Sequence, residues 1–175
     1  MYIDENVTSN DIDKLIERYY PEHKDTLLAL LNLADPRLAM DHLTTNQVTL
    51  CPSVFIARSL AKKGNNVYQY HFTRRREGSE KILSYHGAEI PYVFNTHDEW
   101  LPTNEDDIEL TKAMMEYWTE FAKKGTPNSI NNPTWKEFGI EENYLILDQT
   151  LENSTKLENE FCEIMISEMV QRASR

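Results

Sequence analysis

Apolar side chains recur every three or four positions through most of this 175-residue chain, which is the pattern of amphipathic helices. Near the amino terminus, Ile12, Leu15 and Ile16 follow this spacing, and Pro21 ends the pattern. The helices expected on these grounds cover residues 10–20, 22–34, 35–46, 52–63, 87–94, 104–124 and 155–172. The chain is therefore expected to be mainly helical.

The helix over residues 104–124 is the most strongly indicated of these. Asn104 can accept a hydrogen bond from a free backbone N–H group of the first turn, and three acidic residues follow it at the positive end of the helix dipole. Lys123 and Lys124 stand at the negative end, and Gly125 can adopt the left-handed conformation that commonly ends a helix. Both ends of this helix are thus specified by the local sequence.

Two short segments have the pattern of β-strands instead. Apolar and polar residues alternate over residues 67–73, and residues 143–148 contain a short apolar run. Because helices separate these strands in the sequence, parallel pairing of the α/β type is expected. Two strands alone make a marginal sheet with an exposed edge. The expected architecture is therefore α/β, mainly helical, with two to three strands.

The charge of the chain limits the classes of partner. Its formal net charge is −11, whereas nucleic acid and anionic membrane both require basic surfaces, so neither is expected as a partner. The one dense basic run, Arg74-Arg75-Arg76, stands beside Glu77 and is interpreted as a solvated loop. No apolar stretch is long enough to predict a membrane span, and the acidic first residues do not suggest a secretory signal on this chain.

Five histidines are present, and one of them stands apart. Four are interpreted as structural, namely His23, His42, His71 and His97. No pair of histidines has the spacing and the third ligand of a zinc site, so no metal is expected. His86 is expected in a loop between a strand and a helix, where a side chain can project above a sheet edge. Imidazole titrates near neutral pH, so a histidine in such a place can act as a general base.

The sequence around His86 resembles a known family. Residues 84–94 read Ser-Tyr-His-Gly-Ala-Glu-Ile-Pro-Tyr-Val-Phe, which is similar to the segment that carries the catalytic histidine of carboxylesterase type B enzymes, the family that includes the cholinesterases. Residues 115–128 resemble the family's Tyr-Trp-x-x-Phe-Ala-x-x-Gly-x-Pro-Asn segment. Further similar blocks follow in the family's order, from Asp41 to Cys162.

This resemblance implies that His86 is the general base of a serine esterase. It places Glu89 behind the histidine, although a carboxylate at the start of the next helix is an equal interpretation of this residue. It also places Tyr85 and Ala88 beside the substrate pocket. The resemblance implies a small carboxylic ester as the substrate, and neither a metal nor an organic cofactor.

The two cysteines, Cys51 and Cys162, can be interpreted in two ways. Two lone cysteines in a soluble chain are more often buried free thiols than a bridge, and free thiols fit the cytoplasm. Several members of the family, however, join cysteines at the matching positions, so the resemblance implies a disulfide. Such a bridge closes a long loop and would stabilise the fold by about 4 kcal/mol. It would also imply an oxidising compartment, in a secreted or periplasmic protein.

The chain also departs from the family. The family often has glycine at the positions of Leu83 and Asn95. The nucleophile of these enzymes needs a Gly-x-Ser-x-Gly turn, and no two of the five glycines in this sequence are four positions apart. By the family's spacing, the acid of the catalytic triad is expected ahead of Met1.

The expected protein is therefore the C-terminal portion of a carboxylesterase type B hydrolase with the α/β-hydrolase fold. Residues 1–175 are expected to form one segment, with a helical lead-in over residues 1–46 and a histidine-bearing part over residues 47–175. Such a chain is expected to be inactive alone and to need the N-terminal part of the hydrolase, because a histidine without a nucleophile or oxyanion donors gives little catalysis. The alternative is a catalytically dead binding module or the product of a truncated gene.

Overall fold

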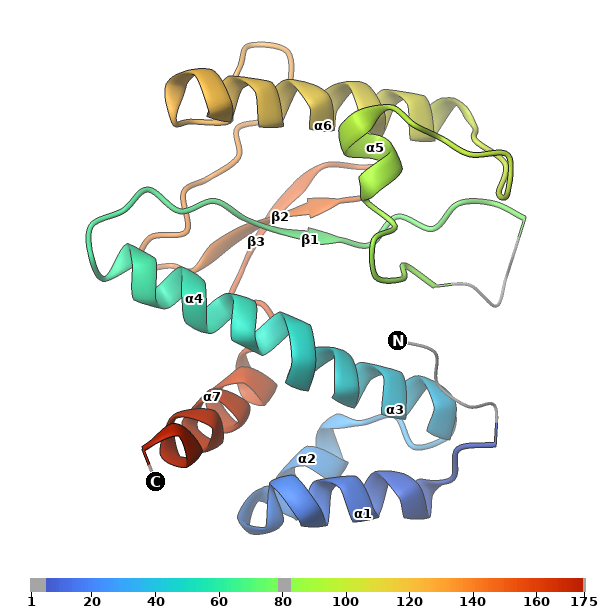
Figure 1. Cartoon of the computed structure of the whole chain (residues 1–175), viewed down its shortest axis with the longest axis vertical. Coiled ribbons are helices and arrows are strands. Elements are labelled where there is room, and N and C mark those ends of the chain that lie inside the picture. Colours follow the sequence, from blue (N-terminus) through green and yellow to red (C-terminus); the bar gives the residue numbers. More distant parts are fainter. Residues whose placement is uncertain (1–5, 79–82, 175) are drawn as a thin grey trace. The chain divides into compact units, whose positions relative to one another are not determined.

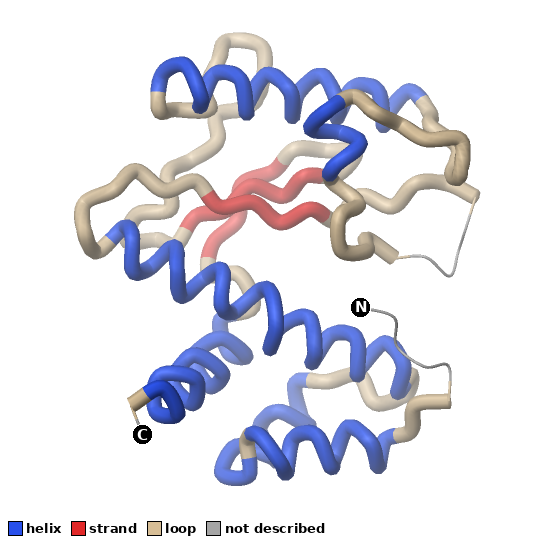
Figure 2. The backbone as a smooth tube through the Cα atoms, viewed as in Figure 1, coloured by secondary structure: helices blue, strands red, loops and turns tan. Residues whose placement is uncertain are grey.

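The computed structural model of this chain describes residues 6–78 and 83–174 (Figure 1). Its helices are α1 (Ser9–Tyr19), η1 (Pro21–His23), α2 (Lys24–Leu30), α3 (Pro36–Thr45), η2 (Asn46–Leu50), α4 (Cys51–Ala61), α5 (Ile90–Phe94), α6 (Glu105–Lys124) and α7 (Asn159–Ala173). Its strands are β1 (Gln69–Phe72), β2 (Asn143–Leu147) and β3 (Glu152–Thr155). Figure 2 shows that helix predominates, so the expected architecture is confirmed.

The chain divides into two compact units. A helical unit comprises Met1–Arg58 and Glu158–Arg175, and a sheet-containing unit comprises Ser59–Leu157. Each unit has its own core of buried apolar side chains. Among the described residues, no helix combines the length and the apolar character that crossing a membrane requires.

The first predicted helix is confirmed as α1 of the helical unit. Asp11 Oδ2 accepts a 3.0 Å hydrogen bond from the Thr8 N–H group, which stabilises the start of the helix. Ile12 and Ile16 lie one turn apart on the same face of α1 and are fully buried. They belong to a core that also contains buried residues of the other helices of this unit, among them Leu27, Leu43, Val54, Phe161 and Met165.

The helices expected over residues 35–46 and 52–63 are joined in the structure. α3 continues through the π-helical turn η2 into α4. At the end of this turn the Cys51 N–H group donates to Asn46 O, five residues earlier in the chain. The next residue is Pro52, which has no N–H group to donate. Sequence patterns missed this continuity because the shift in hydrogen bonding accommodates the proline without ending the helix.

The sheet contains three strands in the order β1-β2-β3. β1 and β2 are parallel, with Gln69 opposite Tyr144 and Phe72 opposite Leu147. The predicted parallel pairing is therefore confirmed. The central strand β2, paired at both edges, contributes the fully buried apolar residues Leu145 and Leu147.

β3 is the element that sequence patterns did not predict, because its residues, Glu-Asn-Ser-Thr, are polar. It pairs with β2 in the antiparallel direction. The Asn153 amide also holds the neighbouring loop: Oδ1 accepts a 3.0 Å hydrogen bond from Lys136 N–H, and Nδ2 donates a 2.8 Å hydrogen bond to Thr134 O. Hydrogen bonds, rather than an apolar face, therefore hold this strand in place.

The most strongly predicted helix is confirmed as α6, which packs with β2 in the core of the sheet-containing unit (Figure 1). Asn104 Oδ1 accepts a 3.0 Å hydrogen bond from Asp107 N–H, and Gly125 has the left-handed conformation, with φ of 72°. In the same core, Trp135 Nε1 donates a 3.0 Å hydrogen bond to Gln69 O. One indole thus joins the loop after α6 to the start of β1.

Candidate active site

His86 lies in a tight turn that leads into α5. The Ala88 N–H group donates to Tyr85 O at 2.9 Å, and the Ile90 N–H group donates to Gly87 O at 3.1 Å. Gly87 has φ of 86°, in the left-handed region where a side chain strains the backbone. The glycine therefore permits the turn, and the turn leaves His86 exposed.

Contacts on both sides of His86 hold this turn. The Ser84 hydroxyl donates a 2.9 Å hydrogen bond to Phe72 O at the end of β1. Ala88 is buried, with 7 % of its surface exposed, whereas Tyr85 is exposed and meets the Trp100 ring edge to face at 5.7 Å. Of the two residues expected beside a substrate pocket, Tyr85 therefore lies at the surface and Ala88 packs inward.

α5 follows the histidine turn and ends at Asn95, one of the two positions where the family often has glycine. Asn95 has φ of 51°, and its N–H group donates to Pro91 O. Asparagine tolerates the left-handed conformation better than most residues do. Asn95 therefore adopts the left-handed conformation that a glycine commonly has at a helix end.

Glu89 lies at the start of α5, where its carbonyl oxygen accepts hydrogen bonds from Tyr92 N–H at 3.0 Å and from Val93 N–H at 3.1 Å. Within residues 6–78 and 83–174, no hydrogen bond or ion pair joins its carboxylate to His86. Burial raises the pKa of the Tyr70 phenol, and the negative charge of Glu89 raises it further. The structure thus places Glu89 as a helix-start carboxylate, and its action behind His86 stays a prediction.

The basic run ahead of this turn is not the solvated loop that the sequence suggested. Arg75 is exposed, but Arg74 and Arg76 are buried, with 9 % and 7 % of their surfaces exposed. Arg74 Nε donates to Asp107 Oδ1 at 2.8 Å, and Arg76 Nη1 donates to Asp98 Oδ1 at 3.1 Å. The interpretation was wrong because the acceptors for these two side chains come from a later part of the chain, which local sequence does not reveal.

Asp107 is the buried centre of this region and has no exposed surface. In addition to Arg74, its carboxylate accepts hydrogen bonds from the Tyr92 hydroxyl at 2.7 Å and from Asn104 N–H at 3.0 Å. Burial by itself would raise the pKa of this carboxyl group, but these donors outweigh it, so the pKa of Asp107 is lowered. Sequence patterns identified Asp107 only as one of three acidic residues at a helix start, and so missed this role.

His97 lies against the same cluster. Its Nε2 is 2.7 Å from Thr111 Oγ1, and its ring meets Tyr92 edge to face at 4.9 Å. Burial lowers the pKa of His97, and the positive charge of Arg76 lowers it further. Burial thus disfavours the charged form of His97, whose ring packs against Tyr92.

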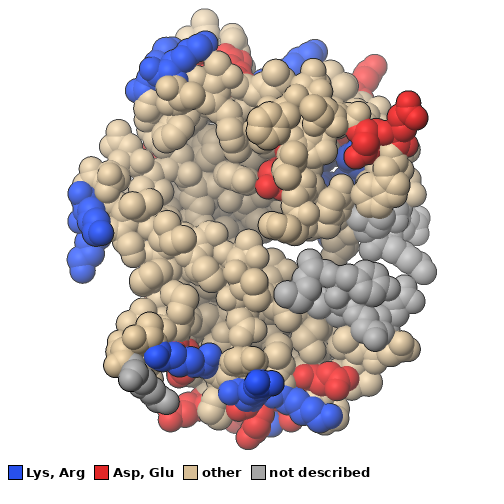
Figure 3. Space-filling model, viewed as in Figure 1, with Lys and Arg blue, Asp and Glu red and all other residues tan. Residues whose placement is uncertain are grey.

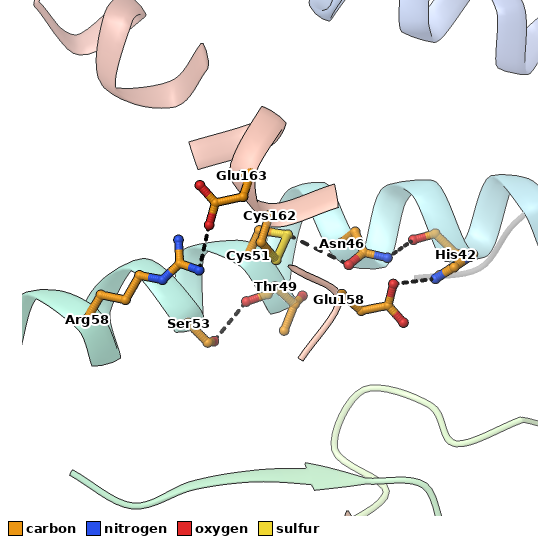
Figure 4. Close-up of a disulfide and its surroundings, with 9 residues drawn as sticks. All are labelled: His42, Asn46, Thr49, Cys51, Ser53, Arg58, Glu158, Cys162 and Glu163. Atoms are coloured by element: carbon orange, nitrogen blue, oxygen red, sulfur yellow. Dashed lines mark hydrogen bonds and ion pairs between the residues drawn. A yellow bond between two sulfur atoms is a disulfide. The ribbon is translucent and has the colours of Figure 1, made fainter. Parts of the chain in front are cut away.

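In the helical unit, Cys51 at the start of α4 and Cys162 in the first turn of α7 form a disulfide (Figure 4). Their Cα atoms lie 4.9 Å apart, and both residues are buried. An ion pair of 2.8 Å between Arg58 and Glu163 joins the same two helices. The pairing that the resemblance implied is therefore confirmed, and the free-thiol interpretation is wrong.

The described residues contain no group of three or more His, Cys, Asp or Glu side chains placed to hold a metal ion. On the face drawn in Figure 3, basic side chains stand in small separate groups, and acidic side chains lie close to several of them. The candidate site consists of His86, its turn and the buried polar cluster that adjoins this turn.

Comparison with known proteins decides the family. The sequence profile of the Carboxylesterase family matches residues 2–165, which is nearly the whole chain. The chain belongs to the carboxylesterase family. The matched range contains His86 and its turn, both cysteines of the disulfide and the buried arginine cluster.

Relatives within the carboxylesterase family are much longer than this chain. Carboxylesterase 1E of Rattus norvegicus is 34 % identical over 111 residues, which are 61 % of this chain and 20 % of that protein. The medium-chain fatty acyl-CoA hydrolase precursor of Anas platyrhynchos is 32 % identical over 110 residues, which are 60 % of this chain and 20 % of that protein. This carboxylesterase-family chain thus spans about a fifth of the length of the curated relatives that it matches.

Solved esterase structures share the fold of the chain. PNB esterase superposes with a TM-score of 0.71 over 94 % of this chain and 34 % of that one, at 20 % identity. An esterase from anaerobic Clostridium hathewayi that can hydrolyze aliphatic aromatic polyesters gives a TM-score of 0.64 over 95 % of this chain and 34 % of that one, at 23 % identity. The helices and the three-stranded mixed sheet therefore correspond to part of an esterase α/β-hydrolase fold.

Proposed function

We propose that His86 is the general base of a serine carboxylesterase, and that this chain supplies it to a complete α/β-hydrolase domain. The observation that carries the proposal is the exposed position of His86 on the Gly87 turn, in a segment that resembles the catalytic-histidine segment of the family. Loops that follow the carboxyl ends of parallel strands are where α/β folds place their chemistry, and this turn lies in the loop after β1.

The proposed reaction is acyl transfer in two steps. The neutral imidazole of His86 takes the proton of a serine hydroxyl as the serine oxygen attacks the ester carbonyl, and it returns that proton to the leaving alcohol. In the second step, a water molecule gives a proton to His86 while its oxygen attacks the acyl-serine. That proton passes to the serine oxygen as the carboxylic acid leaves, so His86 ends the cycle as it began.

The serine, the oxyanion donors and the triad acid belong, in this proposal, to an N-terminal part of the hydrolase. The strand order places β1 at one edge of the sheet, and in this proposal the further strands of the hydrolase continue the sheet beyond that edge. Residues 1–46 then form the helical lead-in, and residues 47–175 form the histidine-bearing part of one segment.

The proposed substrate is a small carboxylic ester. Tyr85 and Ala88 flank His86 in its turn, so they would lie beside the reacting acyl group. Glu89 would act on the imidazole from the start of α5. Neither a metal nor an organic cofactor takes part in this chemistry. The disulfide favours an oxidising compartment for the protein.

The test joins this chain to the N-terminal part of a carboxylesterase and follows the hydrolysis of p-nitrophenyl acetate. The joined protein is expected to hydrolyse the ester, and His86→Gln is expected to lower its kcat by about 10²- to 10⁴-fold. The control is His23→Gln, in the helical unit, whose side chain is 37 % exposed; this variant is expected to keep its kcat. If His86→Gln keeps its kcat as well, His86 is not the base.

The chain on its own separates the proposal from the alternative. It is expected to show no hydrolysis above background that depends on His86. Clear activity that His86→Gln abolishes would contradict the view that the chain is incomplete. A joined protein that folds with its serine in place and yet stays inactive would favour a catalytically dead binding module or a truncated gene product.

A further inference from the structure

Two buried arginines lie next to the histidine turn. Arg74 and Arg76 follow the end of β1 and are separated by the exposed Arg75. Their side chains line a small cavity of about 10 Å³, whose other walls are formed by Leu83, Tyr85, Ala88, Tyr92 and Leu101. Tyr85 and Ala88 stand on either side of His86 in the sequence, so the arginines face the inner side of the turn that carries the histidine.

Arg74 joins three elements through one carboxylate. Its Nε donates to Asp107 Oδ1 at 2.8 Å, and its Nη2 donates to Asn104 Oδ1 at 3.0 Å. The Tyr92 hydroxyl donates to the same oxygen of Asp107 at 2.7 Å. The end of β1, the helix α5 and the start of α6 are therefore held together by charge-assisted hydrogen bonds. Because α5 directly follows the histidine turn, this cluster fixes one end of the turn.

Arg76 holds the loop between α5 and α6 through several hydrogen bonds. Its guanidinium donates to Asp98 O at 3.1 Å and to Pro102 O at 3.2 Å. It also donates to Leu101 O and, at 2.8 Å, to the Thr103 hydroxyl. A guanidinium offers five N–H donors in fixed directions, whereas an ammonium offers three on a flexible stem. So many acceptors around one side chain therefore require arginine, and a lysine of equal charge would leave several of them without a donor.

We propose that Arg74 and Arg76 are positioning residues for His86: the two buried guanidinium groups hold the inner wall of its turn and so set the direction of the imidazole. The inference rests on the proposed function, because it concerns the same histidine. On the amino-terminal side of the turn, the Ser84 hydroxyl donates to Phe72 O. The arginine cluster supplies the support on the other side, through Tyr92 and Leu101.

Amide exchange in the full chain tests whether the arginines hold the turn. The Ala88 N–H group, bonded to Tyr85 O, reports the turn directly. Arg74→Lys and Arg76→Lys keep the charge and are each expected to speed the exchange of this amide by at least about tenfold. Arg75→Lys, between them, is the matched control and is expected to leave the exchange unchanged. Exchange at the wild-type rate in folded Arg74→Lys and Arg76→Lys would overturn the proposal.

Kinetics of the joined protein test whether the turn matters for His86. A misplaced base slows the chemical step but has little effect on substrate binding. Arg74→Lys is therefore expected to lower kcat by about 10²-fold with little change in KM. A residue that only stabilises the fold would leave both constants unchanged in the folded protein. If Arg74→Lys does not fold, Tyr92→Phe takes its place in both measurements, because this variant removes one donor to Asp107 and keeps the ring.

The two proposals fail in different ways. If His86→Gln lowers kcat but the arginine variants, folded, keep theirs, then the positioning role is wrong and the general base is retained. If His86→Gln keeps its kcat, the general base is wrong and the positioning role falls with it. Loss of kcat in both kinds of variant, with Arg75→Lys unaffected, supports both proposals.

Discussion

His42 Nε2 lies 3.1 Å from Glu158 Oε2 (Figure 4). This contact joins α3 to the residue that precedes α7. The pair stands near the disulfide, and the two residues are 116 positions apart in the sequence. Glu158 has a left-handed backbone, with φ of 48°, which is uncommon for a glutamate. The His42–Glu158 contact thus joins the first and last parts of the helical unit, as do the disulfide and the Arg58–Glu163 ion pair.

The stability of the chain is expected to depend on the charge of His42. The hydrogen bond with Glu158 raises the pKa of His42, and burial opposes this without reversing it. Since the raised pKa belongs to the folded state, the pair contributes its full stabilisation of that state below about pH 6.5, the ordinary pKa of histidine. Its contribution is lost as the pH rises through the higher pKa of the folded state.

Urea unfolding of His42→Gln and wild type at pH 5.5 and pH 8.5 measures this contribution. The His42 side chain is 40 % exposed, so solvent screens the pair. At pH 5.5, His42→Gln is therefore expected to lower the free energy of unfolding by less than about 1 kcal/mol. At pH 8.5 the expected loss is smaller. His86→Gln, at an exposed turn, is the control and is expected to change neither value. An equal loss in His42→Gln at both pH values would argue against an ionic contribution.

Two adjacent aspartates at the start of α6 are expected to differ in their effect on stability. Asp107→Ala leaves the buried Arg74 without its principal partner, which is expected to cost about 3–5 kcal/mol. Asp106 is 3.9 Å from Arg74 and its side chain is 36 % exposed, so Asp106→Ala is expected to cost less than about 1 kcal/mol. Urea unfolding at pH 7 measures both. Similar losses in the two variants would contradict the central place of Asp107.

Acid unfolding should also report the contribution of Asp107 to the stability of the fold. Its pKa is lowered in the folded state, so its contribution to stability is complete above about pH 4, the ordinary range of an aspartate. The contribution is lost as the pH falls below that value and through the lower pKa of the folded state. Asp107→Asn is therefore expected to weaken the dependence of the urea midpoint on pH between about pH 4 and pH 2. A slope as steep as that of wild type would show that other carboxyl groups dominate.

The disulfide is expected to stabilise the chain by about 4 kcal/mol, because it closes a loop of 111 residues. The double variant Cys51→Ser/Cys162→Ser should lose this amount in urea unfolding under oxidising conditions. Adding a reductant should lower the wild type to a similar value and leave the double variant unchanged. A reductant effect on the double variant would mean that the measured change has another source.

The end of α5 offers a test of backbone strain beside the histidine turn. Asn95 has a left-handed backbone, so Asn95→Gly is expected to keep the melting temperature or raise it. Asn95→Val places a β-branched residue in that conformation and is expected to cost about 1–2 kcal/mol. Thr96→Val, at the next position, is the control and is expected to have little effect. Equal melting temperatures for Asn95→Gly and Asn95→Val would mean that the helix end is not strained.

Local features of this protein could be predicted from the sequence. The caps of α6 depend on residues only a few positions apart, so their side chains and backbone groups meet whatever the rest of the chain does. The place of His86 between strand and helix follows from the same local patterns. The disulfide was anticipated only through the resemblance, because the spacing of two cysteines does not specify a pairing.

Other features were decided by tertiary structure. Arg74 is 33 positions from Asp107, and its charge suggested a solvated loop until the fold placed a buried carboxylate beside it. β3 is a strand because β2 offers an edge for pairing, although its own residues are polar. Sequence alone thus determined that the chain is mainly helical and where α6 begins and ends. Only the fold decided which charges are buried and which polar segment joins the sheet, because the partners of those groups lie far away along the chain.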